Sequence, residues 1–186
     1  MIVILSGVSG AGKDTIKRIL MGKDGRIKTL PSYTTREKRV NEIEGQNYYY
    51  VSKEKFKEMI DNNEFYEYSI HHGNYYGTNK KLLNERIKNN IVLKDIDVNG
   101  TEDLLKIFRG TEIKIISIFL NISKEEMLRR LSNRDDKLKQ EEIELRMNRY
   151  DYEMNHIGIY DYVIKNYDAE KTSNIILDII KREQEQ

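Results

Sequence analysis

A glycine-rich segment directly after an apolar run is the feature that most restricts what this chain can fold into. The run Ile2–Leu5 predicts a buried strand, and residues 7–15 read Gly-Val-Ser-Gly-Ala-Gly-Lys-Asp-Thr. A helix is expected from about Lys13 to Met21. Glycines between a strand and a helix let successive backbone N–H groups face one concavity at the positive end of the helix. The segment matches G-x-x-x-x-G-K and predicts a phosphate-binding loop in which Lys13 reaches the phosphates.

Beyond this loop, short apolar runs alternate with helical patterns. Strands are expected over Ile91–Val98, Ile113–Leu120 and Tyr162–Ile164, and helices over Thr101–Phe108, Ser123–Asn133 and Thr172–Arg182. Strands that alternate with helices usually form a parallel sheet covered by helices. The chain is therefore expected to have an α/β fold with a central parallel sheet.

Two stretches depart from this alternation. Residues 32–78 are rich in tyrosine, with one helical pattern over Lys53–Asn63 between short half-buried strands, and they predict an inserted mixed α/β lobe. Residues 129–152 are strongly charged and mostly helical. We therefore expect one domain of 186 residues, with a core over 1–31, 79–128 and 153–186, the lobe over 32–78 and a helical lid over 129–152.

Charge and composition exclude several classes of function. Thirty-two basic residues against thirty-one acidic ones leave a net charge of +1, which gives no general attraction to nucleic acid or to membranes. The chain has no cysteine for a disulfide or a thiolate metal site, and its three histidines make a poor zinc set. The apolar runs are too short to span a bilayer or to form a signal peptide, so a cytoplasmic protein is expected.

Acidic side chains at two places are candidate magnesium ligands. The residue after Lys13 in such a loop is usually Ser or Thr, but here it is Asp14, followed by Thr15. Asp14 would bind Mg²⁺ directly or through water, or its charge beside the phosphates would weaken nucleotide binding. Asp95 and Asp97 share one face at the carboxyl end of a strand, where α/β folds place ligands. Asp95 is the candidate second, water-mediated magnesium partner, and a solvated strand end is the alternative.

Several further segments resemble the guanylate kinase family, in order and over nearly the whole chain. They are Ser32-Tyr33-Thr34-Thr35-Arg36-Glu37-Lys38-Arg39, Glu42-Ile43-Glu44-Gly45-Gln46-Asn47-Tyr48, Glu64-Phe65-Tyr66-Glu67, Gly73-Asn74-Tyr75-Tyr76-Gly77-Thr78 and Asp95-Ile96-Asp97-Val98-Asn99-Gly100. The resemblance implies a P-loop kinase fold. It also implies Mg²⁺-dependent transfer of the γ-phosphoryl group of ATP to GMP or dGMP, giving ADP and GDP.

The resemblance implies a role for each matching residue. The 5′-phosphate of the acceptor would be held by Ser32, Arg36, Arg39, Tyr48 and Tyr76, and guanine would be read by Glu67, Thr78 and Asp97. ATP would lie on Gly7, Ser9, Gly10, Ala11, Gly12, Lys13, Asp14 and Thr15, with Asn166 near its base, and Mg²⁺ on Asp14, Thr15 and Asp95. The positive charges around the transferring group would come from Lys13, Arg36, Arg130, Arg134 and Arg146.

The chemistry of guanine supports this assignment independently. Guanine presents N1–H and an exocyclic amino group as adjacent donors, and carboxylates accept from both. Adenine lacks both donors on that edge, so the same carboxylates would be buried against it without partners. Each buried group left without a partner costs about 1–3 kcal/mol, and more when it is charged.

Two alternatives stay open at this point. One is a kinase for another phosphorylated acceptor such as ribose 1,5-bisphosphate, which relatives with a Gly-Lys-Asp loop use. Asp14 favours that acceptor, whereas Tyr48, Glu67, Tyr76 and Asp97 argue against it. The other is a non-catalytic module that binds protein partners, although such modules typically lose loop residues that are present here.

Arg134 departs from the family pattern, because it precedes two aspartates where the family usually has glycine. For the oligomeric state, both a monomer and a homodimer are compatible with the sequence.

Overall fold

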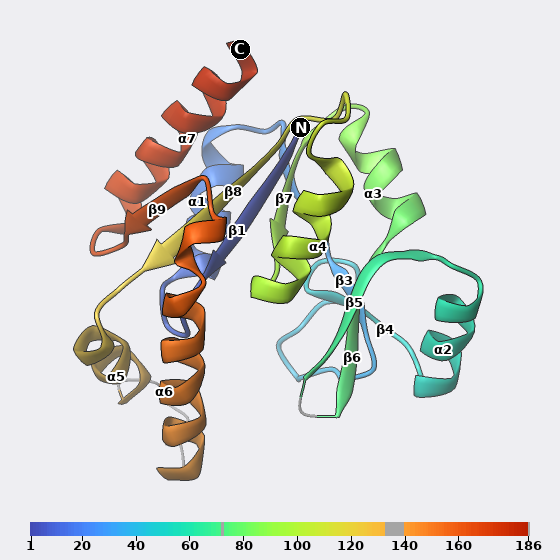
Figure 1. The fold of residues 1–186 in the computed structure, drawn as a ribbon, viewed down its shortest axis with the longest axis horizontal. Helices are drawn as coiled ribbons and strands as arrows, with labels where there is room; N and C mark the ends of the chain where they lie inside the picture. The colour runs from blue at the N-terminus through green and yellow to red at the C-terminus, as the bar shows by residue number, and fades with distance from the viewer. Residues whose placement is uncertain (72, 133–139, 186) are drawn as a thin grey trace. The chain divides into compact units, whose positions relative to one another are not determined.

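The chain folds around a five-stranded parallel sheet, which confirms the expected α/β fold (Figure 1). The structure is a computed structural model that describes residues 1–71, 73–132 and 140–185. The strands are β1 (Ile2–Gly7), β2 (Ile27–Thr29), β7 (Ile91–Asp95), β8 (Ile115–Asn121) and β9 (Tyr162–Lys165), in the order β2-β7-β1-β8-β9. Every residue of β1 is buried, as its unbroken apolar run predicts for a strand that is covered on both faces.

The chain divides into two compact units, and residues 3–25 and 116–186 make up the second of them. Its helices are α1 (Lys13–Lys23), α5 (Lys124–Ser132), α6 (Gln140–Asn155) and α7 (Ala169–Glu185), with a 3₁₀ turn over Ile157–Ile159. Helix α1 packs against α7. The residues that α1 and α7 bury recur four apart, at Ile16 and Leu20 and at Ile176 and Ile180, which is the spacing of one helix face.

The first unit consists of residues 1–2 and 26–115 and contains a separate mixed sheet. Its strands are β3 (Ser32–Thr34), β4 (Tyr48–Tyr50), β5 (Phe65–His71) and β6 (Asn74–Asn79), in the order β4-β3-β6-β5. Helices α2 (Lys53–Asp61), α3 (Lys80–Ile87) and α4 (Val98–Phe108) belong to the same unit. The sheet and α2 share a small core in which Phe56 stacks on Phe65 at a ring distance of 4.5 Å.

Several predicted element boundaries differ from the structure, and a helix cap explains the most important difference. The strand expected over Ile91–Val98 ends at Asp95, and the helix expected from Thr101 begins at Val98. Asp97 is the N-cap, because its Oδ1 accepts a hydrogen bond of 2.9 Å from the backbone N–H of Gly100. The strand expected over Ile113–Leu120 starts two residues later, at Ile115. Strand β2 and helix α3 were not predicted, since they span only three and eight residues.

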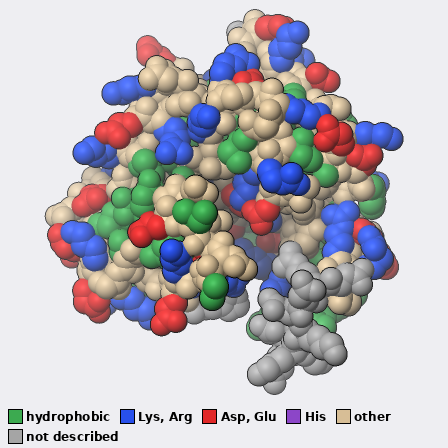
Figure 2. Space-filling model, turned by 180° about the vertical axis from the view of Figure 1, so that it is seen from behind, with side chains coloured by type: hydrophobic (Ala, Val, Ile, Leu, Met, Phe, Trp, Pro, Cys, Tyr) green, Lys and Arg blue, Asp and Glu red, His purple; other side chains and the backbone are tan. Residues whose placement is uncertain are grey.

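The surface of the described residues carries both signs of charge. Figure 2 shows Lys and Arg side chains interspersed with Asp and Glu over the viewed face, as the net charge of +1 leads one to expect. Among the residues that the structure describes, no helix is both long and apolar enough to cross a lipid bilayer.

Candidate active site

The loop between β1 and α1 has a backbone conformation that only glycine adopts readily. Gly10 and Gly12 have φ angles of 76° and 89°, in the left-handed region. A Cβ on Gly12 would lie 2.8 Å from Nδ2 of Asn166, so the position lacks space for a side chain as well. Gly12 is also the N-cap of α1, and the free N–H groups of that helix end give the loop a partial positive charge.

Three carbonyl oxygens of this loop each accept a hydrogen bond from a side chain. Nζ of Lys13 donates to the oxygen of Gly7 at 2.8 Å. A guanidinium N–H of Arg130 donates to the oxygen of Gly10 at 3.2 Å, and Nδ2 of Asn166 donates to the oxygen of Ala11 at 2.6 Å. Because a peptide unit directs its N–H opposite to its carbonyl, the bonds to Gly7 and Ala11 favour N–H groups of Val8 and Gly12 that face the concavity, which is the arrangement an anion requires. The N–H of Ala11 instead donates to the oxygen of Val8 at 3.0 Å.

Two predicted arginines come to the loop from α5 and α6. Arg130 also donates to Oε1 of Glu126 at 2.6 Å and to the carbonyl of Asn166 at 2.9 Å. Hydrogen bonds from Arg129 and Arg130 lower the pKa of Glu126 to about 2, so this carboxylate stays charged and holds both guanidinium groups. Arg146 donates to Oγ of Ser9 at 2.8 Å. The third predicted arginine, Arg134, lies outside the described residues.

Asn166 follows β9 and has an incompletely satisfied side chain. It is 3% exposed, and its Oδ1 has no hydrogen-bond partner among the described residues. Its backbone N–H donates to the carbonyl of Asn121 at 2.8 Å, which joins the ends of β8 and β9. A buried amide oxygen without a partner can accept a hydrogen bond from a ligand donor beside the loop.

The predicted magnesium ligands are oxygen donors but form no protein cage. Asp14 is largely exposed, and its carboxylate pairs with Lys17 at 2.7 Å. No group of three or more His, Cys, Asp or Glu side chains among the described residues could hold a metal ion. Mg²⁺ typically binds through one or two carboxylates, substrate phosphates and water. Asp14 and Thr15 lie in the first turn of α1, and Asp95 is the last residue of β7, so each of them stays a candidate ligand for Mg²⁺.

In the first unit, Glu42 organises the residues predicted to hold a phosphate. Its Oε1 accepts from Arg36 at 2.7 Å, and its Oε2 accepts from the backbone N–H of Arg39 and from the hydroxyl of Tyr50, both at 2.9 Å. The hydrogen bond from Arg36 is the main reason that the pKa of Glu42 falls to about 2. The guanidinium of Arg36 also lies 5.2 Å from the centre of the Tyr48 ring.

Two predicted tyrosines and the serine complete this group. The rings of Tyr48 and Tyr76 meet edge to face at 5.9 Å. Strand β3 pairs in parallel with β4, which places Ser32 opposite Tyr48, and it pairs antiparallel with β6, which places Thr34 opposite Tyr76. The mixed sheet thus joins predicted residues from three strands through their pairing.

The predicted base-reading residues Glu67 and Thr78 are bonded to each other. Both are buried, they are opposite one another in the β5–β6 pair, and the hydroxyl of Thr78 donates to Oε1 of Glu67. Burial raises the pKa of Glu67, while the positive charge of Lys94 and the Thr78 hydrogen bond oppose that rise. A Cβ on Gly100 would lie 3.2 Å from Oε2 of Glu67, so the start of α4 approaches the carboxylate closely.

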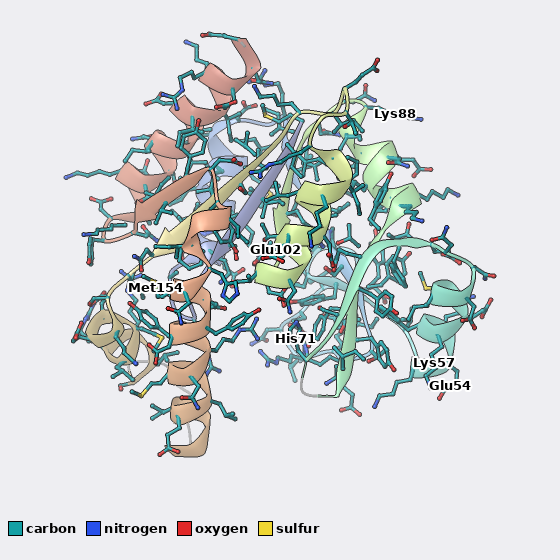
Figure 3. All side chains as sticks on the ribbon, in the orientation of Figure 1. Glu54, Lys57, His71, Lys88, Glu102 and Met154 are labelled. Carbon is teal, nitrogen blue, oxygen red and sulfur yellow. The ribbon has the colours of Figure 1, made fainter. Side chains whose placement is uncertain are left out.

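Asp97 is held by two bonds, and neither of them was predicted from the sequence. Oδ1 caps α4, and Oδ2 lies 2.6 Å from Nε2 of His71. His71 is the last residue of β5, and Figure 3 labels it there. His71 was not among the predicted site residues. Its contact with Asp97 joins two segments that are 26 positions apart, and a local sequence pattern does not predict such a long-range contact. A role for Glu42 could have been predicted from the sequence, because it begins one of the family-like segments and lies three residues after Arg39.

Comparisons with known proteins agree over the full length of the chain. A family model described as guanylate kinase matches residues 1–183. A guanylate kinase of Prochlorococcus marinus subsp. pastoris is 40% identical over 182 residues, covering 97% of this chain and 96% of the relative. One of Helicobacter pylori is 40% identical over 184 residues, covering 97% and 86%. The crystal structure of guanylate kinase from Anaplasma phagocytophilum has a TM-score of 0.79 at 31% identity, covering 100% of this chain and 87% of that one. A shikimate kinase from Acinetobacter baumannii, at 16% identity and a TM-score of 0.53, shares the fold alone.

Two glycines of the same segment should respond to alanine with opposite signs. Gly12→Ala forces a side chain into the left-handed region against Asn166 and should lower the free energy of unfolding by about 1–3 kcal/mol. Gly22→Ala, in α1 with open space around it, should raise that free energy by up to about 1 kcal/mol. Urea unfolding measures both. Equal effects would show that the loop conformation is not constrained at Gly12.

Glu42 should stabilise the fold in a pH-dependent way. Its pKa is about 2 in the folded chain against 4.5 ordinarily, so its contribution is fully present above pH 4.5 and is lost as the pH falls through about 2. Glu42→Gln should lower the free energy of unfolding at pH 6 by about 1–3 kcal/mol, and the difference from wild type should shrink from pH 4.5 to pH 3. The control is Glu58→Gln, at a largely exposed side chain. A difference that stays constant with pH would contradict the assigned role of the carboxylate.

Proposed function

This chain belongs to the guanylate kinase family, and we propose that two groups of its residues divide the phosphotransfer reaction between them. The chain is an ATP:GMP phosphotransferase. The first group, on the β1–α1 loop, α5, α6 and the end of β9, binds the phosphates of ATP. The second group, on the mixed sheet and the start of α4, binds GMP. Residues 129–152 carry the arginines of the first group, and residues 32–78 carry most contacts of the second.

The donor group supplies positive charge and oriented amides to the triphosphate. Lys13, Arg130 and Arg146 are the cations, and the amides of residues 8–10, 12 and 13 supply the neutral donors, while the Ala11 amide donates to Val8 within the loop. The hydrogen bonds within the loop support this role of the donor group. Lys13 donates to the carbonyl oxygen of Gly7, Arg130 to that of Gly10, and Asn166 to that of Ala11. The buried Oδ1 of Asn166 suits the exocyclic amino group of adenine, which is a donor.

Magnesium would be held by few protein ligands. Asp14, Thr15 and Asp95 would supply oxygen atoms, directly or through water, to an ion that is bound mainly by phosphate oxygens. When bound, the ion neutralises charge on the phosphates. Since Asp14 pairs with Lys17 at 2.7 Å, the lysine has to release or share that carboxylate when the ion binds.

The acceptor group binds the 5′-phosphate through cations and hydroxyls. Arg36 and Arg39 suit a dianionic phosphate because charge-assisted hydrogen bonds from guanidinium groups are strong. The hydroxyls of Ser32, Tyr48 and Tyr76 add neutral donors. Glu42 fixes the guanidinium of Arg36 and the backbone of Arg39, so the phosphate contacts are oriented before the substrate arrives.

Selectivity for guanine rests on Glu67 and Asp97, and their fixed geometry is the observation that carries the proposal. Both carboxylates are already held, Glu67 by the hydroxyl of Thr78, and Asp97 by the Gly100 amide at Oδ1 and by Nε2 of His71 at Oδ2. Guanine offers N1–H and an amino group as donors to such carboxylates. Adenine lacks these donors, so it would leave the two acids poorly solvated.

The chemical step needs positioning more than covalent help. An oxygen of the GMP phosphate attacks the γ-phosphorus of ATP, a new P–O bond forms, and the bond from γ-phosphorus to the bridging oxygen of ADP breaks. No general base is required, because the attacking phosphate is already ionised. Lys13, Arg130 and Arg146 offset the charge that spreads over the transferring group.

Charge-neutral variants of the two acids test the base-reading role. Glu67→Gln and Asp97→Asn should each lower kcat/KM for GMP by about 10- to 100-fold, because each weakens a hydrogen bond to a charged group. The KM for ATP should stay within about twofold of wild type, since the donor residues are unchanged. Steady-state kinetics with each substrate varied in turn gives both values.

The matched control for these variants is Glu58→Gln, which removes a largely exposed carboxylate of the same unit. It should leave both kinetic constants unchanged. If Glu67→Gln and Asp97→Asn behave like this control, the two acids do not read the base.

A further inference from the structure

Lys94 is a buried cation for which the reaction described so far has no use. It lies on β7, whose other residues before Asp95 are apolar, and it is 1% exposed. Among the residues that the structure describes, no other lysine or arginine is buried. A lysine loses hydration when it is buried, so it is retained at such a place only where its ammonium finds partners.

The partners of Lys94 lie in the acceptor group. Its Nζ is 2.5 Å from Oγ of Ser32 and 3.4 Å from the carbonyl oxygen of Leu30. These residues follow β2, which pairs in parallel with β7, and the backbone N–H of Leu30 continues the pairing by donating to Leu93 at 3.1 Å. The strand pairing therefore brings the ammonium to the serine.

The bond to Lys94 determines what the serine hydroxyl can do. An ammonium group has only donors, so Oγ of Ser32 must accept in this contact. The hydrogen of the serine hydroxyl is then left to donate elsewhere. A phosphate dianion has only acceptor oxygens, so a hydroxyl fixed as a donor is the form that binds it.

The same charge acts on the base-reading side. Burial raises the pKa of Glu67, and the charge of Lys94 is the largest effect that opposes this rise, ahead of the hydrogen bond from Thr78. A buried carboxylate needs such a counter-charge to stay ionised. Only an ionised carboxylate offers acceptors alone to the two adjacent donors of guanine.

We propose that Lys94 is a positioning residue for GMP, because its ammonium fixes Ser32 as a donor to the phosphate and keeps a positive charge beside Glu67. This inference rests on the proposed roles of Ser32 and Glu67. One buried cation thus acts on two parts of the acceptor site. It acts on the phosphate-binding Ser32 through a hydrogen bond and on the base-reading Glu67 through the electrostatic attraction between their charges.

Lys94→Met tests the proposal, because methionine keeps most of the length and removes the charge. The KM for GMP should rise by about tenfold or more, and the KM for ATP should stay within about twofold of wild type. The matched control is Lys28→Met, at an exposed position on the neighbouring strand β2, which should change neither constant. An unchanged KM for GMP, or a parallel rise in both constants, would overturn the proposal.

Measuring the effect of Lys94→Met in a variant that already lacks the two residues it acts on distinguishes this inference from the proposed function. Ser32→Ala and Glu67→Gln should each raise the KM for GMP, and if neither does, the proposed acceptor site is itself wrong. In a chain that carries both changes, adding Lys94→Met should raise the KM for GMP by less than about twofold, because the residues through which Lys94 acts are gone. A full effect of Lys94→Met in that background would show that it acts in another way.

Chemical rescue covers the case in which Lys94→Met does not fold. The chain has no cysteine, so the single thiol of Lys94→Cys can be alkylated with 2-bromoethylamine in denaturant and the protein refolded beside wild type. Alkylation restores an ammonium at nearly the length of lysine. The alkylated protein should bind GMP with a KM close to wild type, and the unalkylated protein about tenfold more weakly. Equal KM values would show that the charge has no role.

Discussion

The orientation of five peptide units between β1 and α1 is the constraint on which the rest of the site depends. Anion binding requires that amides face the ligand and that carbonyls face away. The oxygens of Val8 and Gly12 accept from the backbone of Ala11 and Ile16, each at 3.0 Å. Those of Gly7, Gly10 and Ala11 accept from Lys13, Arg130 and Asn166. Side chains from α1, α5 and the end of β9 therefore hold the loop in the form that binds phosphate.

Three charged groups among the acceptor residues follow a related rule, because each of them is held by neighbours before the substrate binds. Glu42 holds Arg36, Thr78 holds Glu67, and His71 and the Gly100 amide hold Asp97. Catalysis by positioning depends on such preorganisation, because groups that are already oriented lose little entropy when the substrate binds. The mixed sheet provides it, since its pairings set Thr78 opposite Glu67 and Ser32 opposite Tyr48.

Local signals in the sequence were sufficient for the phosphate loop, the α/β fold and the helix of the inserted segment. The contacts that hold the loop could not be predicted in the same way, because Arg130 and Asn166 lie 120 and 155 positions from the residues that they bind. The start of α4 was misplaced because the capping role of Asp97 is visible only once its side chain is located. The role of Lys94 was not predicted from the sequence, because a single lysine within an apolar run does not indicate whether its side chain is buried.

The most direct test of the account is an ATP-consumption assay with GMP, dGMP, AMP and ribose 1,5-bisphosphate side by side, run on wild type and on Lys13→Met. We expect rapid consumption with GMP, little with AMP or the sugar bisphosphate, and loss of activity when the loop lysine is replaced. Turnover with the sugar bisphosphate alone would contradict the reading of guanine by Glu67 and Asp97. Equal activity in wild type and Lys13→Met would contradict the role of the loop.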